Sequence, residues 1–159
     1  MKIYTKKGDR GETRMLFGDK VSKDDLAPDA YGSVDELVAA LGLIRADKKL
    51  PIEVKENRKK LKPDETLVEE KMVLRLEKDI DFLEEKNGIP EFFVVPGEND
   101  LSAKFDWARV VSRRAERKCV RWQRHLEIDN SKVVVYLNRL SDLLWMLARE
   151  FENDWTPSK

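Results

Sequence analysis

The sequence predicts an all-α fold: an up-down bundle of four or five helices that follows an ordered, glycine-containing N-terminal arm. The first observation is that apolar residues recur at helical spacing along four long segments between residues 28 and 151. The second is that residues 1–24 are polar, carry three glycines and show no helical period. The third is that no repeat, low-complexity tract or domain linker interrupts the chain. We therefore expect residues 1–159 to form a single domain in which long amphipathic helices pack antiparallel.

Each helix is placed by its apolar period and by the residues that end it. Asn87-Gly88 supplies a stop signal, and Pro90 follows. The segment 91–97, EFFVVPG, is too short for a helix and predicts an extended connector, while the lysine-rich residues 47–63 predict a connection or a short helix. The expected helices span 28–46, 64–87, 100 or 102 to about 126, and 131–151. Their predicted core faces are Val34, Leu37, Val38, Leu41 and Ile44; Leu67, Met72, Leu76, Ile80 and Leu83; Trp107, Val111, Ala115, Trp122 and Leu126; and Leu137, Leu140, Leu144, Leu147 and Phe151.

Composition and charge exclude several classes of partner. The chain of 159 residues is 41% hydrophobic, enough for one globular core, and its 31 basic residues balance its 31 acidic residues. This balance predicts no nucleic acid and no anionic membrane as a partner, so any anion must be bound by a local cluster. A lone Cys119 and a lone His125 exclude an internal disulfide and leave no metal site built from cysteine or histidine. No stretch is apolar enough for a signal peptide or a membrane span, which predicts a cytoplasmic protein.

The third expected helix carries arginines on the side opposite its predicted core. At about 100° per residue, Arg109, Arg113 and Glu116 lie close together, with Arg117 beside them. One interpretation is a solvated face with weak ion pairs, to Asp106 and Glu116, between residues three apart. The other is a buried interface that binds a polyphosphate, because apolar residues are interleaved with the arginines. Those apolar residues are Phe105, Val110 and Val120.

Two other expected helices also carry distinctive stripes away from their core faces. The stripe on the fourth helix is either an interface with chemistry or a plain subunit contact. The stripe on the first helix consists of small residues around one carboxylate, Asp35, and lets another helix approach closely. If covered, Asp35 needs a cationic partner, which the arginines could supply; if the stripe is only a packing seam, Asp35 is a structural ion-pair partner. The stripes are Asn138, Asp142, Trp145 and Arg149 on the fourth helix, and Asp35, Ala39, Gly42 and Ala46 on the first.

The N-terminal arm contains a glycine-bearing segment, TKKGDRGET, over residues 5–13. Its glycines let backbone N–H groups approach phosphate oxygens, and its lysine and threonine side chains add contacts. The segment lacks the GxxxxGK[ST] pattern of a Walker A loop, and an ordinary turn is the other interpretation. The candidate phosphate ligands are Thr5, Lys6, Lys7, Gly8, Asp9, Gly11 and Thr13.

Three blocks of sequence together resemble one enzyme family. They are IYTKKGDRGETRMLFGDKVSKDD (3–25), AYGSVDELVAALG (30–42), and ARVVSRRAER (108–117) taken with YLNRLSDLLWMLAR (136–149). In this order and combination the chain resembles the corrinoid adenosyltransferases of the propanediol-utilisation type, which make adenosylcobalamin from ATP and cob(I)alamin. The resemblance implies a homotrimer of helical bundles with active sites between neighbouring subunits.

The resemblance also implies roles for individual residues. ATP would be bound by the candidate phosphate ligands of one subunit's arm together with Lys23. Asp35 would pair with Arg109 across the subunit interface, and catalysis would depend on Asp35, Arg109 and Arg113. The facing subunit would add to the ATP site Arg113, Arg114, Glu116, Arg117 and Asn138.

The reaction that the resemblance implies is an SN2 displacement, in which cob(I)alamin attacks the 5′-carbon of ATP and expels triphosphate. The corrinoid carries the hard chemistry, so no side-chain base is needed. The protein would position both reactants, and arginine, lysine and Mg²⁺ would stabilise the departing triphosphate, with no metal site built from protein ligands. Phe93, with Phe92 as the second choice, would exclude the lower axial base of the corrinoid and leave the cobalt four-coordinate, which makes Co(II) easier to reduce.

The same resemblance implies two further partners, a reductase and an enzyme that uses adenosylcobalamin. The alternative function is a non-catalytic trimeric module that carries or senses ATP or a corrinoid. The chain departs from the family pattern at Asp106, where relatives often carry His, so a corrinoid-side contact is expected to differ. It also ends at Lys159, earlier than relatives whose C-terminal residues cover the corrinoid, and Trp155 is a candidate substitute. Residues 47–90 match no motif of the family.

Overall fold

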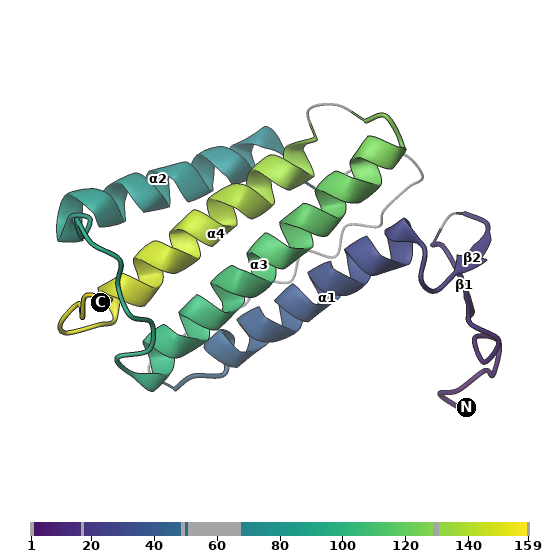
Figure 1. Ribbon diagram of the computed structural model, residues 1–159, viewed down its shortest axis with the longest axis horizontal. Coiled ribbons are helices and arrows are strands. Elements are labelled where there is room, and N and C mark those ends of the chain that lie inside the picture. The colour runs from purple at the N-terminus through teal and green to yellow at the C-terminus, as the bar shows by residue number, and fades with distance from the viewer. Residues whose placement is uncertain (1, 17, 49, 51–67, 129–130, 159) are drawn as a thin grey trace.

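The computed structural model describes residues 2–16, 18–48, 50, 68–128 and 131–158. Within these residues the chain is mostly helical, as the sequence predicts (Figure 1). The elements are β1 (Glu12–Arg14), β2 (Lys20–Ser22), α1 (Leu26–Arg45), α2 (Glu70–Asn87), α3 (Asp100–His125) and α4 (Lys132–Glu150). The all-α prediction is wrong in one detail, the two-stranded sheet, because three-residue strands are too short to show a period of two. The expectations for residues 51–67 lie outside the described residues.

The N-terminal arm is an antiparallel hairpin that extends beyond the N-terminal end of α1 (Figure 1). Its register pairs Glu12 with Ser22, and the backbone N–H of Lys23 donates to the carbonyl oxygen of Gly11 over 2.8 Å. Gly11 has φ of +80°, a conformation that favours glycine, so this residue lets the chain turn into β1. The arm is therefore ordered by its own backbone pairing.

The ends of the helices follow from local chemistry. α3 begins at Asp100 because the Asn99 side chain accepts hydrogen bonds from the backbone N–H groups of Leu101 and Ser102, each over 3.0 Å. The Ser102 hydroxyl accepts from the backbone N–H of Asn99 over 3.2 Å, which completes a capping box. α2 ends at Asn87, and the next residue, Gly88, has a φ of +72°.

The helices lie side by side in the order α2, α4, α3, α1 (Figure 1). Ion pairs between neighbours show their directions: residue numbers rise together along α2 and α4, and in opposite senses along α1 and α3. Strict up-down alternation among the described helices is therefore wrong, because α1, α2 and α4 run one way and α3 runs the other. The pairs are Glu70–Lys132 and Glu77–Arg139 in the first case, and Glu36–Arg114 and Asp47–Lys104 in the second.

The core lies where α3 and α4 meet their neighbours, and small side chains form its centre. Ala108, Val111 and Ala115 of α3 are fully buried, and the Ser112 hydroxyl donates to the Leu137 carbonyl oxygen of α4 over 3.1 Å. Small residues at these positions let the helix backbones approach closely. No helix in the described part of the chain is long and apolar enough to cross a membrane.

The predicted core faces are partly wrong. Trp107 is 51% exposed, Val38 is 60% exposed and Leu126 is also exposed. Phe105, grouped with the arginines from the sequence, is instead buried and stacks on Phe151 with ring centroids 5.5 Å apart. The reason is that α3 packs against both α1 and α4, so its buried face is wider than one stripe and turned away from Trp107.

Candidate functional site

The N-terminal arm encloses a cationic hollow with a volume of about 730 Å³. All of its lining residues lie between Thr5 and Lys23, and six of them are lysine or arginine against one glutamate. Such a hollow suits a polyanion. The structure brings six predicted ligands into the lining and leaves Asp9 and Gly11 in the same loop outside it. The lining residues are Thr5, Lys6, Lys7, Gly8, Arg10, Glu12, Thr13, Arg14, Lys20 and Lys23.

The end of the Lys23 side chain folds closely over Gly8 in this hollow. A Cβ atom at Gly8 would lie 3.0 Å from Nζ and 3.2 Å from Cε of Lys23. A side chain at this position would displace the lysine. The sequence missed Arg10, Arg14 and Lys20, although the last two pair in the hairpin register and a strand prediction would have brought them together.

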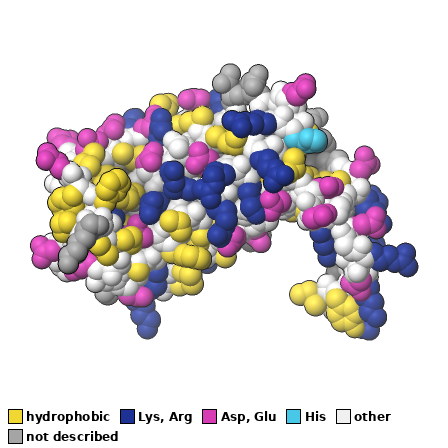
Figure 2. Space-filling view, viewed as in Figure 1, with side chains coloured by type: hydrophobic (Ala, Val, Ile, Leu, Met, Phe, Trp, Pro, Cys, Tyr) yellow, Lys and Arg dark blue, Asp and Glu magenta, His cyan; other side chains and the backbone are white. Residues whose placement is uncertain are grey.

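The arginine face of α3 divides into engaged and free side chains. Arg114 pairs with Glu36 of α1, and Glu116 accepts a hydrogen bond from the Asn138 amide over 3.4 Å. Arg113 and Arg117 are exposed, and no ion pair involves them within the described residues. Lysine and arginine side chains gather along the middle of the molecule in the space-filling view (Figure 2). The face thus presents uncompensated positive charge to solvent.

Within one chain the arm hollow and the arginine face remain separate. The arm projects from the end of the bundle, and no α3 residue lines its hollow (Figure 1). Asp35 lies exposed on α1, and within the described residues Arg109 pairs with Asp106 rather than with Asp35. The predicted small stripe of α1 also faces outward at Ala39 and Ala46, where none of the described helices covers it.

A second hollow, of about 590 Å³, lies beside the connector between α2 and α3. Phe93 is 87% exposed there, and Arg109 and Trp145 contribute to the wall. The connector is extended, as predicted: Val95 N–H donates to the Thr156 carbonyl over 2.8 Å, and Phe93 C=O accepts from Ser158 N–H over 2.7 Å. The C-terminal tail thus holds the connector by backbone pairing. The hollow is lined by Ile89, Pro90, Glu91, Phe92, Phe93, Val94, Arg109 and Trp145.

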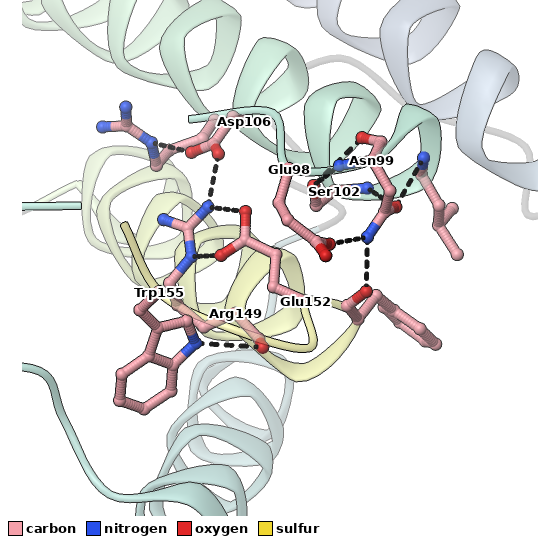
Figure 3. Close-up of polar contacts among 10 residues, drawn as sticks. Glu98, Asn99, Ser102, Asp106, Arg149, Glu152 and Trp155 are labelled. Carbon is pink, nitrogen blue, oxygen red and sulfur yellow. Dashed lines mark hydrogen bonds and ion pairs between the residues drawn. The ribbon is translucent and has the colours of Figure 1, made fainter. Parts of the chain in front are cut away.

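Arg149 does not belong to the outward stripe of α4, where the sequence placed it. Its side chain is 2% exposed and lies between two carboxylates (Figure 3). Nη2 donates to Asp106 over 2.6 Å, and Nε and Nη2 donate to Glu152 over 2.6 and 2.7 Å. Burial by itself lowers the pKa of Arg149, but the hydrogen bonds and charges of Glu152 and Asp106 outweigh it and raise the pKa. Of the rest of that stripe, Asp142 is exposed, and Asn138 and Trp145 are half-buried.

Cys119 can be excluded from nucleophilic chemistry, and His125 lines neither of the two hollows. Cys119 is buried, and burial raises the pKa of its thiol, which suppresses the reactive thiolate. His125 is exposed at the C-terminal end of α3. In the described part of the chain, no group of three or more His, Cys, Asp or Glu side chains is arranged to hold a metal ion.

Comparisons with known proteins point to one family. The family model for cobalamin adenosyltransferases matches residues 3–151. A corrinoid adenosyltransferase from Citrobacter freundii is 33% identical, with 93% of each chain covered. Corrinoid adenosyltransferase PduO from Salmonella typhimurium is 31% identical over 97% of this chain, which spans about half (51%) of that relative.

Solved structures extend the likeness to three dimensions. A variant PduO-type ATP:co(I)rrinoid adenosyltransferase from Lactobacillus reuteri, complexed with ATP, has a TM-score of 0.75 at 30% identity, covering 94% of this chain and 93% of that one. Another variant, complexed with cobalamin and ATP, has a TM-score of 0.74 at 28% identity, covering 93% and 89%. Sequence and fold together place this chain in the cobalamin adenosyltransferase family.

Proposed function

We propose that this protein transfers the 5′-deoxyadenosyl group of ATP to cob(I)alamin and releases adenosylcobalamin and triphosphate. The observation that carries the proposal is the family match over residues 3–151, which includes both the cationic arm hollow and the aromatic hollow at Phe93. The first suits a triphosphate, and the second suits the face of a large planar ring. One molecule thus carries a surface for each reactant.

The ATP site is completed by a second copy of the chain in a homotrimer. Its two halves, the arm hollow and the α3 arginines, lie apart within one chain. The arm also exposes apolar side chains, with Ile3 99% and Leu16 77% exposed, and these need a cover. We place the arm of one subunit over Arg113, Arg114, Glu116, Arg117 and Asn138 of its neighbour.

The subunit boundary also joins Asp35 to Arg109. Both side chains lie beside exposed apolar residues, Val38 next to Asp35 and Val110 next to Arg109. An ion pair surrounded by apolar contacts is partly shielded from water and salt, so it can fix the orientation of the two subunits.

The protein contributes positioning and electrostatics to the reaction. The cobalt(I) electron pair forms the Co–C5′ bond as the C5′–O bond breaks, and the bonding electrons leave with triphosphate. Arm lysines together with Arg113 and Arg117 stabilise the charge that develops on the leaving group. Mg²⁺ would be carried by the phosphates with few protein ligands, which is its usual manner of binding in phosphoryl sites. Phe93 occupies the lower face of the corrinoid.

The proposed setting includes two partners and a compartment. A reductase supplies the electron that produces cob(I)alamin, and an adenosylcobalamin-dependent enzyme receives the product. We place these reactions in the cytoplasm.

Absorbance tests the proposal directly. Protein, ATP, Mg²⁺ and chemically reduced cobalamin are mixed without oxygen, and formation of the cobalt–carbon bond changes the corrin spectrum. The proposal predicts stoichiometric loss of ATP with release of triphosphate. ATP binding by calorimetry without any spectral change or triphosphate would contradict catalysis and identify a carrier or sensor.

A further inference from the structure

Arg109 is anchored at one end of its guanidinium, and Asp106 provides the anchor. The Arg109 Nε–H donates to Asp106 Oδ1 over 3.2 Å, between side chains that are 26% and 7% exposed. Arginine has five N–H donors in a rigid plane, so a bond at Nε fixes the direction of the four Nη–H donors and leaves them for the proposed pairing with the neighbour's Asp35 and for the hollow. Because Arg109 lines the hollow at Phe93, this bond determines how its guanidinium meets the contents of that hollow.

Asp106 is itself held from the other side by buried groups. Its Oδ2 accepts from Arg149 Nη2 over 2.6 Å, and Glu152 takes the remaining edge of that guanidinium (Figure 3). Two arginines and two carboxylates give the cluster no net charge, which lets Asp106 remain ionised without unbalanced charge in the interior. The carboxylate thus reaches Arg109 from a rigid support.

We propose that Asp106 is a positioning residue for the corrinoid: held by the buried Arg149, it orients the Arg109 guanidinium at the wall of the hollow beside Phe93. The inference rests on the proposed function for the identity of the ligand. The orientation itself rests only on contacts within the chain.

Two isosteric variants separate positioning from folding. Asp106→Asn and Glu152→Gln each remove one carboxylate charge from Arg149, so they disturb the buried cluster to a comparable degree. Only Asp106 also contacts Arg109. In Asp106→Asn the single amide oxygen is expected to stay with the fully buried Arg149, which turns the amide NH2 group toward Arg109 and breaks the Nε contact. A change at Arg149 would not be a clean control, because its guanidinium lies 5.6 Å from the ring centroid of Trp145, which forms part of the hollow wall.

The first measurement needs no ligand. In ¹H–¹⁵N spectra, the Arg109 Nε–H should give a slowly exchanging resonance in the wild-type protein and in Glu152→Gln, and lose its protection in Asp106→Asn. Loss of this protection in both variants, or in neither, would overturn the assignment of Asp106 as the anchor. This outcome stands whether or not the protein proves to be an adenosyltransferase.

The second measurement is the affinity for cob(II)alamin in the presence of ATP, from its visible spectrum. Asp106→Asn should weaken binding by about 10- to 100-fold, the range expected from misplacing a binding group. Glu152→Gln should leave corrinoid affinity unchanged, and ATP affinity should be unchanged in both. Equal losses in both variants would show a general structural effect and overturn the proposal. No corrinoid binding by the wild-type protein would instead refute the proposed function.

A third variant tests the claim without changing the buried residues Asp106, Arg149 and Glu152. Arg109→Lys keeps the positive charge but removes the Nε donor, so it should weaken corrinoid binding as much as Asp106→Asn does. Adding Asp106→Asn to Arg109→Lys should cause no further loss, because the two changes break the same contact. Additive losses would contradict the proposal. If Asp106→Asn does not fold, Arg109→Lys alone decides, and unchanged affinity in it overturns the proposal.

Discussion

The N-terminal arm and the junction of α3, α4 and the C-terminal tail are both rich in charged residues, but they use charge differently. In the arm, cationic side chains line an open hollow, and the Lys20–Glu12 ion pair is largely exposed. At the junction, the side chains of Arg149 and Glu152 are only 2% and 1% exposed, and hydrogen bonds satisfy both. Charge left in solvent is available to a ligand or a neighbour, whereas buried and paired charge shapes the fold. We therefore propose that the arm depends on a partner, whereas the junction is complete within one chain.

The largest expected effect is on stability at the junction. Arg149→Leu removes the cation between Asp106 and Glu152, which leaves the buried Glu152 carboxylate without its cation and Asp106 with Arg109 alone, so the free energy of unfolding should fall by about 3–5 kcal/mol. The matched change in the arm, Lys20→Ala, breaks an exposed pair and should cost less than about 1 kcal/mol. Urea unfolding at equal protein concentration measures both. Similar losses would remove the distinction between the two regions.

The second effect is on catalysis without stability. Arg113 is exposed and forms no ion pair with the described residues, so Arg113→Ala should leave the melting temperature and the assembly unchanged. Loss of one preorganised donor to the leaving group should lower kcat by about 100- to 1,000-fold. Lys78→Ala, an exposed change on α2, is the control and should retain full activity. Near-normal turnover by Arg113→Ala would refute its role.

The third effect separates the two aromatic residues of the connector. Phe93 is the more exposed of the pair, so Phe93→Ala should not affect folding but should lower formation of four-coordinate cob(II)alamin roughly 10-fold, near the upper range of a single aromatic contact. Phe92→Ala should have the smaller effect. The visible spectrum of bound cob(II)alamin gives the result, and the reverse order would exchange the two assignments.

The smallest effect is the pH dependence of an ion pair at the end of α4. The hydrogen bond from Lys86, followed by one from Asn87, lowers the pKa of Glu150 below its ordinary value of 4.5. A lowered folded-state pKa adds stability above pH 4.5 that is lost as the pH falls through the folded-state pKa. Glu150→Gln should therefore cost less than about 1 kcal/mol at pH 7, and the difference should shrink steadily below pH 4.5. A constant difference across this range would contradict the assignment.

Sequence patterns predicted the parts of the fold that depend on local period. The four described helices, the extended connector and six of the ten residues that line the arm hollow were predicted because helical spacing, Pro-Gly punctuation and the glycine-bearing segment are readable locally. Arg149 was misplaced because a single helical wheel assumes one buried face, whereas α4 packs against both α2 and α3. Trp107 was misplaced for the same reason on α3. Asp106 and Arg149 are 43 positions apart in the sequence and pair only because α3 packs against α4, which no local pattern encodes.

The most direct test of the intersubunit site is complementation between two inactive variants. One carries Lys6→Ala and Lys23→Ala in the arm, and the other carries Arg113→Ala in α3. Co-assembled in equal amounts, half of the arms and half of the α3 faces are wild-type, so about one quarter of the sites should combine both intact halves. The corrinoid absorbance assay should therefore recover about one quarter of wild-type activity. Activity no greater than that of the two variants assayed separately would contradict a site shared between subunits.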